Sequence, residues 1–242
     1  MSVTAQWVVH PDDVAPERDE GDTAETRVTF DASNGCEHLE QRVVRFDPGR
    51  SRPRRLGDRQ EVLYVVSGSG GLVLGGREHR LEPDTGAFVA PGETYEVDNP
   101  GPEPLVVVSV TAPEDRAAAS GERRVTVRYD DQPELVASEE RRFRYLVNQD
   151  AGCFDVTQFV GVVDPSKAPE HSHTYDEVGY IVDGEGIAHI DGRELPLRPG
   201  SCFHLRPGQV HCIENNGAGR MRILGVFHPS GDPASRAYPD NN

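Results

Sequence analysis

Residues 170–184 read EHSHTYDEVGYIVDG, and residues 206–215 read RPGQVHCIEN. The first stretch contains His171, His173 and Glu177, and the second contains His211. Three imidazoles and one carboxylate are ligands of the kind that hold Mn, Fe, Ni, Cu or Zn in proteins. A His-x-His pair on a surface strand is usually only solvated, but here both stretches are framed by turn residues. The set therefore predicts a transition-metal site.

The spacing of these residues predicts a closed or sandwiched sheet. Side chains of an extended strand repeat every second residue, so His171 and His173 are expected on one side. Glu177 has the same parity but lies too far along for one straight strand, so residues 174–176 must bend the chain back. His211 must then come from a separate strand. Only a barrel or sandwich gathers side chains from different strands into one interior.

The chain contains an internal duplication. At a displacement of 116 residues (177 − 61), Glu177 falls on Glu61 and Asn215 on Asn99. Upstream the displacement becomes 117 (153 − 36), and Cys153 falls on Cys36. Self-similarity of this kind indicates repeated structural units. It predicts an N-terminal domain over residues 1–112, a linker over 113–124 and a C-terminal domain with an extended tail over 125–242.

The local patterns are those of an all-β protein. Short β-branched runs occupy residues 61–66, 104–110, 156–163 and 221–227, and 25 Gly and 19 Pro separate such runs. Residues 114–120 offer at most one short helical turn.

The two copies differ where metal chemistry would occur. Arg55, Gly57 and Tyr95 stand at the places of His171, His173 and His211, and only Glu61 is kept. One carboxylate cannot hold a transition metal tightly, so the first copy is expected to be metal-free. Glu61 could pair with Arg55, because a buried carboxylate needs a partner. The other interpretations are a pocket for an organic anion lined by Arg55, Glu61 and Tyr95, and a degenerate copy kept for folding.

These residues resemble the motifs of the cupin superfamily. The match to its two motifs comprises His171, His173, Glu177 and Gly184, then Gly200, Gly208, His211 and Asn215. Pro165 and Arg206 depart from the pattern at turn positions, not at ligands. The resemblance implies two tandem cupin barrels (the jelly-roll or double-stranded β-helix fold), a bicupin. It also implies one divalent transition metal per chain, with Fe or Mn favoured and Ni, Cu or Zn as alternatives.

Three functions are compatible with this site. A divalent ion held by three neutral imidazoles and one carboxylate keeps a net charge of about +1 (2 − 1), which favours small anionic ligands. Metal-containing cupins include dioxygenases, decarboxylases and isomerases. A dioxygenase-like oxidoreductase is the first expectation. A non-redox isomerase, lyase or hydrolase, and a binding or sensor protein without turnover, are the alternatives.

Other residues are candidates for the surroundings of the metal. Tyr175 is expected to guard the mouth of the barrel, and Asn215 to support the turn after His211. The remaining candidates have packing or solvated roles as alternatives: Gln158, Tyr180, His204 and Arg206.

The cysteines are expected to be reduced. Cys36 and Cys153 occupy equivalent places and are expected to pack in the core, and Cys202 and Cys212 could lie on neighbouring strands. Strand alternation turns Cys212 away from the ligand His211.

Composition narrows the classes of partner. The formal net charge of −16 would repel a nucleic-acid backbone. No apolar run is long enough to span a bilayer, and no export signal is visible, so a cytoplasmic location is expected. The expected partner is a small molecule, and the sequence leaves open whether the protein forms a homodimer.

Overall fold

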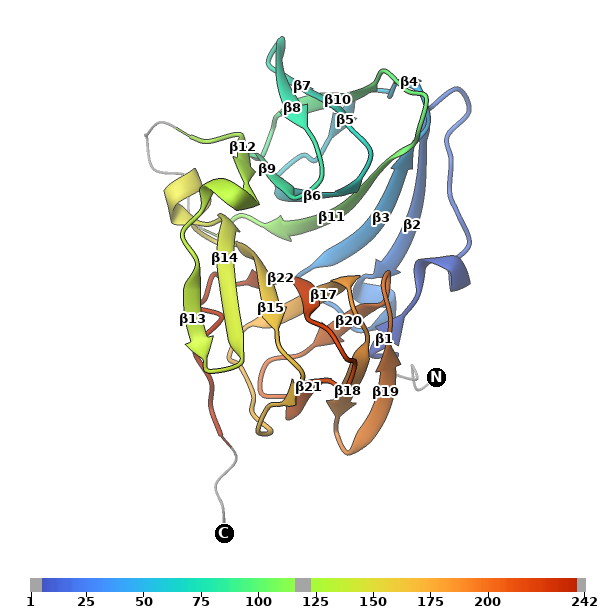
Figure 1. Cartoon of the computed structure of the whole chain (residues 1–242). Helices are drawn as coiled ribbons and strands as arrows, with labels where there is room; N and C mark the ends of the chain where they lie inside the picture. Colours follow the sequence, from blue (N-terminus) through green and yellow to red (C-terminus); the bar gives the residue numbers. More distant parts are fainter. Residues whose placement is uncertain (1–5, 116–122, 239–242) are drawn as a thin grey trace.

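The computed structural model describes residues 6–115 and 123–238. Its regular secondary structure is almost entirely β-strand, arranged in four antiparallel sheets (Figure 1). The N-terminal half is built on a six-stranded sheet in the order β12 (Thr126–Arg128), β9 (Thr85–Val89), β6 (Arg59–Ser67), β11 (Leu105–Pro113), β3 (Glu40–Phe46) and β2 (Ala24–Phe30). A five-stranded sheet faces it, with β4 (Gly49–Arg50), β10 (Thr94–Asn99), β7 (Gly70–Leu74) and β8 (Arg77–Leu81) in order, and β5 (Arg54–Arg55) paired with β10.

The C-terminal half repeats this plan. Its seven-stranded sheet has the order β1 (Val8–Val9), β20 (Cys202–Leu205), β17 (Asp176–Asp183), β22 (Met221–His228), β15 (Thr157–Val163), β14 (Arg141–Val147) and β13 (Leu135–Ser138). The opposing sheet has the order β16 (Ser166–Lys167), β21 (His211–Asn215), β18 (Gly186–Ile190) and β19 (Arg193–Leu197). The 3-10 turns are η1 (Pro11–Asp13), η2 (Ala32–Asn34), η3 (Tyr129–Asp131) and η4 (Gln149–Ala151). The all-β prediction is confirmed, and the described residues include no helix able to cross a bilayer.

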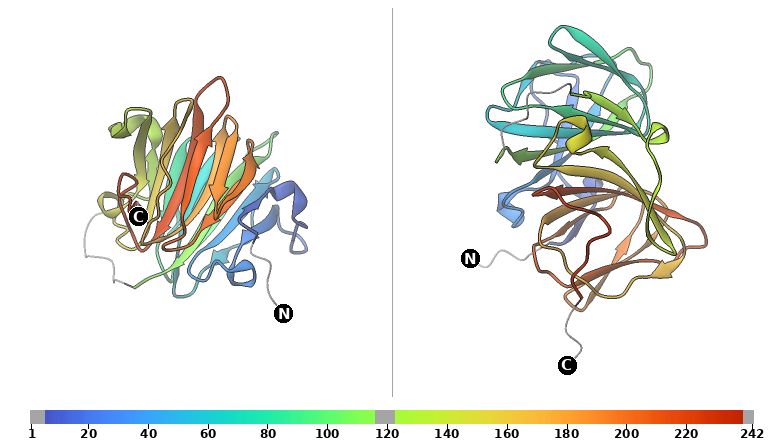
Figure 2. Two further views of the ribbon diagram at one scale, coloured as in Figure 1. Left: turned by 90° about the horizontal axis from the view of Figure 1, so that it is seen from below. Right: turned by 90° about the vertical axis from the view of Figure 1, so that its left-hand side faces the viewer.

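Strand alternation divides the apolar side chains among the interior of each barrel and the interface between the barrels. On β6, Leu63 and Val65 point into the N-terminal barrel, whereas Val62 and Tyr64 point toward the other half. On β17, Ile181 points into the C-terminal barrel, and Val178 and Tyr180 belong to the core shared with the first half. The two large sheets thus pack face to face, and the halves stack as seen in Figures 1 and 2.

Each half supplies an edge strand to the other. β1 pairs with β20 of the C-terminal half, with Val8 opposite Phe203. β12 pairs with β9 of the N-terminal half, with Thr126 opposite Ala87. The two sheets therefore extend across the expected domain division. Residues 116–122 of the expected linker, and most of the short turn expected over 114–120, lie outside the described residues.

Equivalent loops place one cysteine of each half in the shared core. η2 and η4 end in Gly35 and Gly152, with φ of 93° and 87°, a left-handed conformation that glycine adopts without strain. Cys36 and Cys153 follow and are buried between the halves. All four cysteines are free and buried. The expectation that Cys202 and Cys212 lie on neighbouring strands is wrong, because β20 and β21 belong to different sheets.

Candidate metal centre

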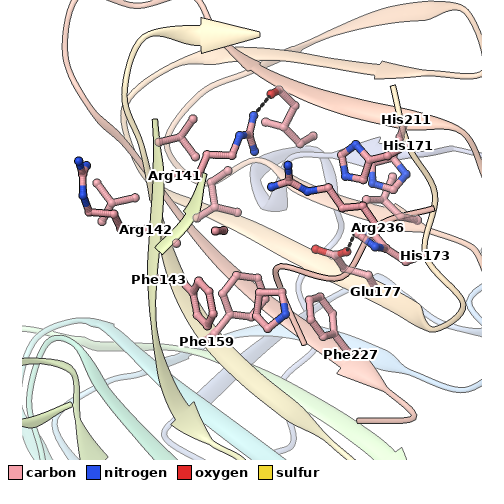
Figure 3. Close-up of a pocket in the computed structure, with 18 of the residues that line it drawn as sticks. Arg141, Arg142, Phe143, Phe159, His171, His173, Glu177, His211, Phe227 and Arg236 are labelled. Carbon is pink, nitrogen blue, oxygen red and sulfur yellow. Dashed lines mark hydrogen bonds and ion pairs between the residues drawn. The ribbon is translucent and has the colours of Figure 1, made fainter. Parts of the chain in front are cut away.

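The three predicted histidines converge at one end of the C-terminal barrel. His171 and His211 form an isolated antiparallel bridge, with backbone N–H···O distances of 3.0 and 2.9 Å. One ring nitrogen from each of His171, His173 and His211 lies within 4.8 Å of the others (Figure 3). A single ion can reach all three imidazoles with small side-chain movements.

Glu177 completes the set from β17. The chain bends at residues 174 and 175, and β17 begins at Asp176. Oε2 of Glu177 lies 3.9 Å from Nε2 of His173. Alternation along β17 turns Glu177 into the barrel and Asp176 to the opposite face.

Backbone carbonyls orient two of the histidines. Nδ1 of His171 lies 2.9 Å from the carbonyl oxygen of Pro169, and Nδ1 of His211 lies 2.8 Å from that of Gln209. A carbonyl only accepts, so Nδ1 carries the proton in each ring and Nε2 keeps a free lone pair. This arrangement is usual for imidazoles that bind a metal.

The electrostatics of the cluster fit a divalent cation. Burial lowers the pKa of His171 to about 4 and the pKa of His173 to about 3, and it also lowers the pKa of His211. The imidazoles are therefore neutral and able to act as ligands at neutral pH. Burial, with a smaller contribution from Asp176, raises the pKa of Glu177 to about 8. A bound cation would favour the ionised Glu177 carboxylate, which needs such a partner at this buried position.

Aromatic side chains support the ligands and wall the pocket. Phe143, Phe159 and Phe227 line a pocket of about 640 Å³, its open mouth included. The Tyr175 ring stacks on His173 and Phe227, with centroid distances of 4.7 and 4.0 Å. Tyr175 is buried behind His173, so its expected place at the mouth of the barrel is wrong. It fixes the orientation of the imidazole.

Two arginines that the sequence analysis missed line the same pocket. Arg141 comes from β14, and its Nη2 donates to the carbonyl oxygen of Ile213. Arg236 comes from the C-terminal tail, which hydrogen bonds between Ser172 and Ala237 (2.8 and 3.0 Å) tie to the barrel. The tail is thus part of the site. Arg236 is the sole basic residue of positions 229–242, which is the signal that could have identified it.

The arginine charges act on the three histidines. Arg236 contributes to lowering the pKa of His171, His173 and His211, and Arg141 contributes at His171 and His211. Figure 3 shows Arg141 and Arg236 on the same side of the pocket as the histidines. The polar lining of the pocket thus consists of the histidine cluster with Glu177 and of arginine side chains.

Three of the residues named as pocket candidates face the other way. Nε2 of Gln158 donates to the carbonyl oxygen of Leu63 in the N-terminal half, at 3.2 Å. Tyr180 packs in the core between the halves. His204 lies between Phe203 and Leu205, which line the pocket, so alternation turns it outward. The pocket assignments of these three residues are therefore wrong, because strand alternation turns their side chains away from the pocket.

The last two candidates have structural positions. Asn215 donates to the carbonyl oxygens of Val163 and Gly219, both at 2.8 Å, and accepts from the Gly217 amide at 3.0 Å. It closes a turn, as expected. The Arg206 side chain is exposed, and a Cβ added at Gly35 would lie 2.3 Å from its Nη2. Arg206 therefore lies against the N-terminal half and not in the pocket.

The equivalent place in the N-terminal barrel is a hydrogen-bonded carboxyl. The Tyr95 hydroxyl donates to Oε2 of Glu61 at 2.7 Å, and the Ser109 hydroxyl donates to Oε1. Arg55 and Gly57 are exposed, whereas Glu61 is buried. The expected pairing of Glu61 with Arg55 is wrong, as is their expected meeting in one anion pocket.

The repeated fold and its motif residues match a known family. The family described as "Cupin domain" matches residues 42–111 and 159–227, together more than half of the chain. The chain is a two-domain cupin.

Two relatives match parts of this cupin. The Thermotoga maritima oxalate-binding protein is 35% identical over 58 residues, which is 24% of this chain and 48% of the relative. A Methanocaldococcus jannaschii protein without an assigned function is 32% identical over 65 residues, 26% of this chain and 52% of the relative. The chain therefore spans about half the length of the curated relatives it matches.

Solved structures share the complete fold. A Pseudomonas aeruginosa protein named for induction by glyoxylate aligns with a TM-score of 0.80 at 19% identity, covering 96% of this chain and 91% of that one. A Bacillus subtilis oxalate decarboxylase variant aligns with a TM-score of 0.73 at 14% identity, covering 94% and 78%. At these identities the likeness establishes the fold alone.

Proposed function

We propose that this cupin is a metal-dependent enzyme acting on a small carboxylate-bearing metabolite. The observation that carries the proposal is the convergence of three histidines and Glu177 at a pocket that also holds Arg141 and Arg236. When bound, a divalent transition metal supplies Lewis-acid polarisation and, if redox-active, a place for dioxygen.

The arginines define the class of substrate. An arginine guanidinium pairs with a carboxylate through two parallel hydrogen bonds, and its strength grows away from water. Arg141 already donates to the carbonyl oxygen of Ile213, whereas Arg236 is held over the pocket by the tail. Arg236 is therefore assigned to orient the substrate carboxylate. The similarity to an oxalate-binding protein supports a small carboxylate.

The phenylalanines limit the size of the substrate. Phe143, Phe159 and Phe227 form an apolar wall of the pocket, so the part of the substrate next to them is short and apolar or absent. The same wall excludes water, which strengthens the attraction between Arg236 and a carboxylate.

The pocket favours oxidative chemistry over isomerisation. The titratable side chains among its described lining residues are the four ligands and the three arginines Arg141, Arg142 and Arg236. Arg142 is already bound to Asp164, 3.1 Å away. An isomerase requires a positioned general base, and the described lining holds no imidazole or carboxylate besides the four predicted ligands. A dioxygenase-like reaction is therefore the preferred assignment, and metal-assisted decarboxylation is the second candidate.

The test is turnover of a panel of small mono- and dicarboxylates by protein loaded separately with Fe²⁺ and Mn²⁺. Oxygen consumption matched to product is the expected result. Turnover that continues without air would select the non-redox alternative. Carboxylate binding without product, under both metals, would overturn the enzyme proposal in favour of a binding protein.

Arg236→Gln gives a sharper test of the substrate class. It should raise KM for the carboxylate by about 10- to 100-fold, the loss expected for a charge-assisted hydrogen bond. Metal content should be unchanged. Arg220→Gln, at an exposed ion pair with Asp164, is the matched control. An unchanged KM in Arg236→Gln would refute the assigned role.

A further inference from the structure

A second cluster of metal-binding side chains lies between the two halves. One donor atom from each of Cys36, Asp176 and His204 lies within 4.8 Å of the others. The three residues are 1%, 3% and 1% exposed. None of them lines the pocket of the candidate metal centre.

Strand phase places this cluster behind the candidate metal centre. Asp176 and Glu177 are neighbours on β17, so one points to the interface and the other into the barrel. His204 is turned the same way on β20. Cys36 arrives from the N-terminal half, just after the left-handed Gly35. The cluster therefore joins the two halves.

Two further imidazoles stand beside it. Nδ1 of His38 lies 3.4 Å from Oδ2 of Asp176, and the His38 side chain is 54% exposed, so this imidazole is in contact with solvent. His228 lies opposite Asp176 in the β17–β22 register, and its ring stacks on His38 at 5.9 Å. His228 is buried, and its Nδ1 has no hydrogen-bond partner among the described residues. Its Nε2 lies 3.3 Å from Oδ2 of Asp115.

The equivalent place on the other side of the interface lacks these ligands. Cys153 is the counterpart of Cys36, and its Sγ donates to Oε1 of Gln60 at 3.1 Å. Gln60 and Phe88 stand where Asp176 and His204 stand (176 − 116 = 60; 204 − 116 = 88). Packing of the two halves therefore does not require an acid and an imidazole here.

The donor set has the chemistry of a zinc-type site. Thiolate, imidazole and carboxylate are ligands that Zn²⁺ takes in closed four-coordinate sites. A thiolate and a carboxylate neutralise a divalent ion (2 − 1 − 1 = 0), which suits a buried position. Burial raises the pKa of the Cys36 thiol, so binding would release its proton to solvent. Nε2 of His204 lies 2.6 Å from Oδ1 of Asp176, while Oδ2 faces His38.

We propose that Cys36, Asp176 and His204, with His38 as the fourth donor, bind a second divalent cation of the Zn²⁺ class that links the two halves of the chain. The site is separate from the His171–His173–His211–Glu177 centre and does not depend on the proposed enzymatic function.

Cobalt substitution tests the proposal directly. Co²⁺ bound by a thiolate gives a sulfur-to-metal charge-transfer band in the near ultraviolet, and the three-histidine centre cannot produce it. The full chain carrying His171→Ala and His211→Ala should still bind one equivalent of Co²⁺ and show this band. Adding Cys36→Ser should abolish the band, whereas Cys153→Ser, the matched control, should keep it.

His204→Gln provides a second variant in the same background in case Cys36→Ser folds poorly, and circular dichroism reports folding of each variant. It should weaken Co²⁺ binding at least tenfold. Absence of the band in the double-alanine protein would overturn the proposal, and so would a band that survives Cys36→Ser. A chelator should also lower the Tm of the double-alanine protein, and it should leave the Tm unchanged once Cys36 is serine.

Discussion

The two barrels place a buried glutamate at the same point of the same fold and use it differently. Glu177 lies beside three imidazoles, and Glu61 receives hydrogen bonds from Tyr95 and Ser109. Burial raises the pKa of both carboxyls. The scaffold therefore supplies a desolvated acid in each half, and the neighbouring residues decide whether it is fit to bind a cation or is held as a hydrogen-bonded carboxyl.

The largest expected effect is loss of metal from the C-terminal barrel. His211→Ala should reduce metal affinity by more than about 100-fold, because loss of an outer-sphere partner alone typically costs 10- to 100-fold. Tyr95→Phe, at the equivalent place, should leave metal content unchanged. Elemental analysis after chelator dialysis measures both. Equal metal content in wild type and His211→Ala would break the comparison.

The turn asparagines should matter equally for stability and unequally for metal. Asn99 bonds the carbonyls of Phe46 and Glu103 and the Gly101 amide (2.9, 3.0 and 2.8 Å), repeating the pattern of Asn215. Alanine at either place should cost about 1–3 kcal/mol of unfolding free energy, since buried polar groups lose their partners. Only Asn215→Ala should also weaken metal binding, because Asn215 shares β21 with His211. Denaturant titration with and without metal separates the two effects.

Replacing each of the two glutamates by glutamine should shift Tm in opposite directions. The pKa of Glu61 is raised in the folded protein, so its stabilising contribution is complete below the unfolded value of 4.5 and is lost as pH rises through the folded pKa. Glu61→Gln should therefore raise Tm relative to wild type, by more at pH 8 than at pH 5.

Glu177→Gln should instead lower the Tm of metal-loaded protein, because it removes a ligand. Thermal melts of both variants across pH give the comparison. A Tm difference between Glu61→Gln and wild type that shrinks from pH 5 to pH 8 would contradict the burial argument.

The smallest effect is expected at Tyr175. Its hydroxyl lies 3.4 Å from the carbonyl oxygen of Asp232, a weak contact, whereas its ring stacks on His173. Tyr175→Phe should change unfolding free energy by less than about 1 kcal/mol and leave metal affinity unaltered. Tyr175→Leu should weaken metal binding, because the imidazole loses its support. Isothermal titration with Mn²⁺ compares the two.

Much of this molecule could be predicted from local sequence. The duplication and the β-branched runs correspond to the repeated sheets, and β6, β11, β15 and β22 coincide with the expected strands. The four predicted ligands were chosen by residue type and spacing, and the structure places them close together. The metal itself stays a prediction.

The predictions that failed concern side chains whose position depends on contacts between distant parts of the chain. Gln158 and His204 could be assigned a face only once the pairing of β15 and β20 in the large sheet was known. Arg236 reaches the pocket because the tail folds back onto Ser172, a contact across 65 positions (237 − 172) that no local pattern indicates. Arg55 was misplaced because the pairing differs by one residue: Tyr95, the counterpart of His211, lies opposite Arg54 and not Arg55, whereas His211 lies opposite His171.

The exchange of β1 and β12 has a consequence for how the molecule comes apart. If the chain is cut within the segment that joins the halves, the N-terminal fragment lacks β12, which pairs with β9, and the C-terminal fragment lacks β1, which pairs with β20. Each fragment then exposes unpaired backbone groups along a sheet edge, which is a template for self-association. Neither fragment is then expected to be a well-behaved monomer. Calorimetry of the intact chain should show one cooperative melting event and not a separate transition for each barrel.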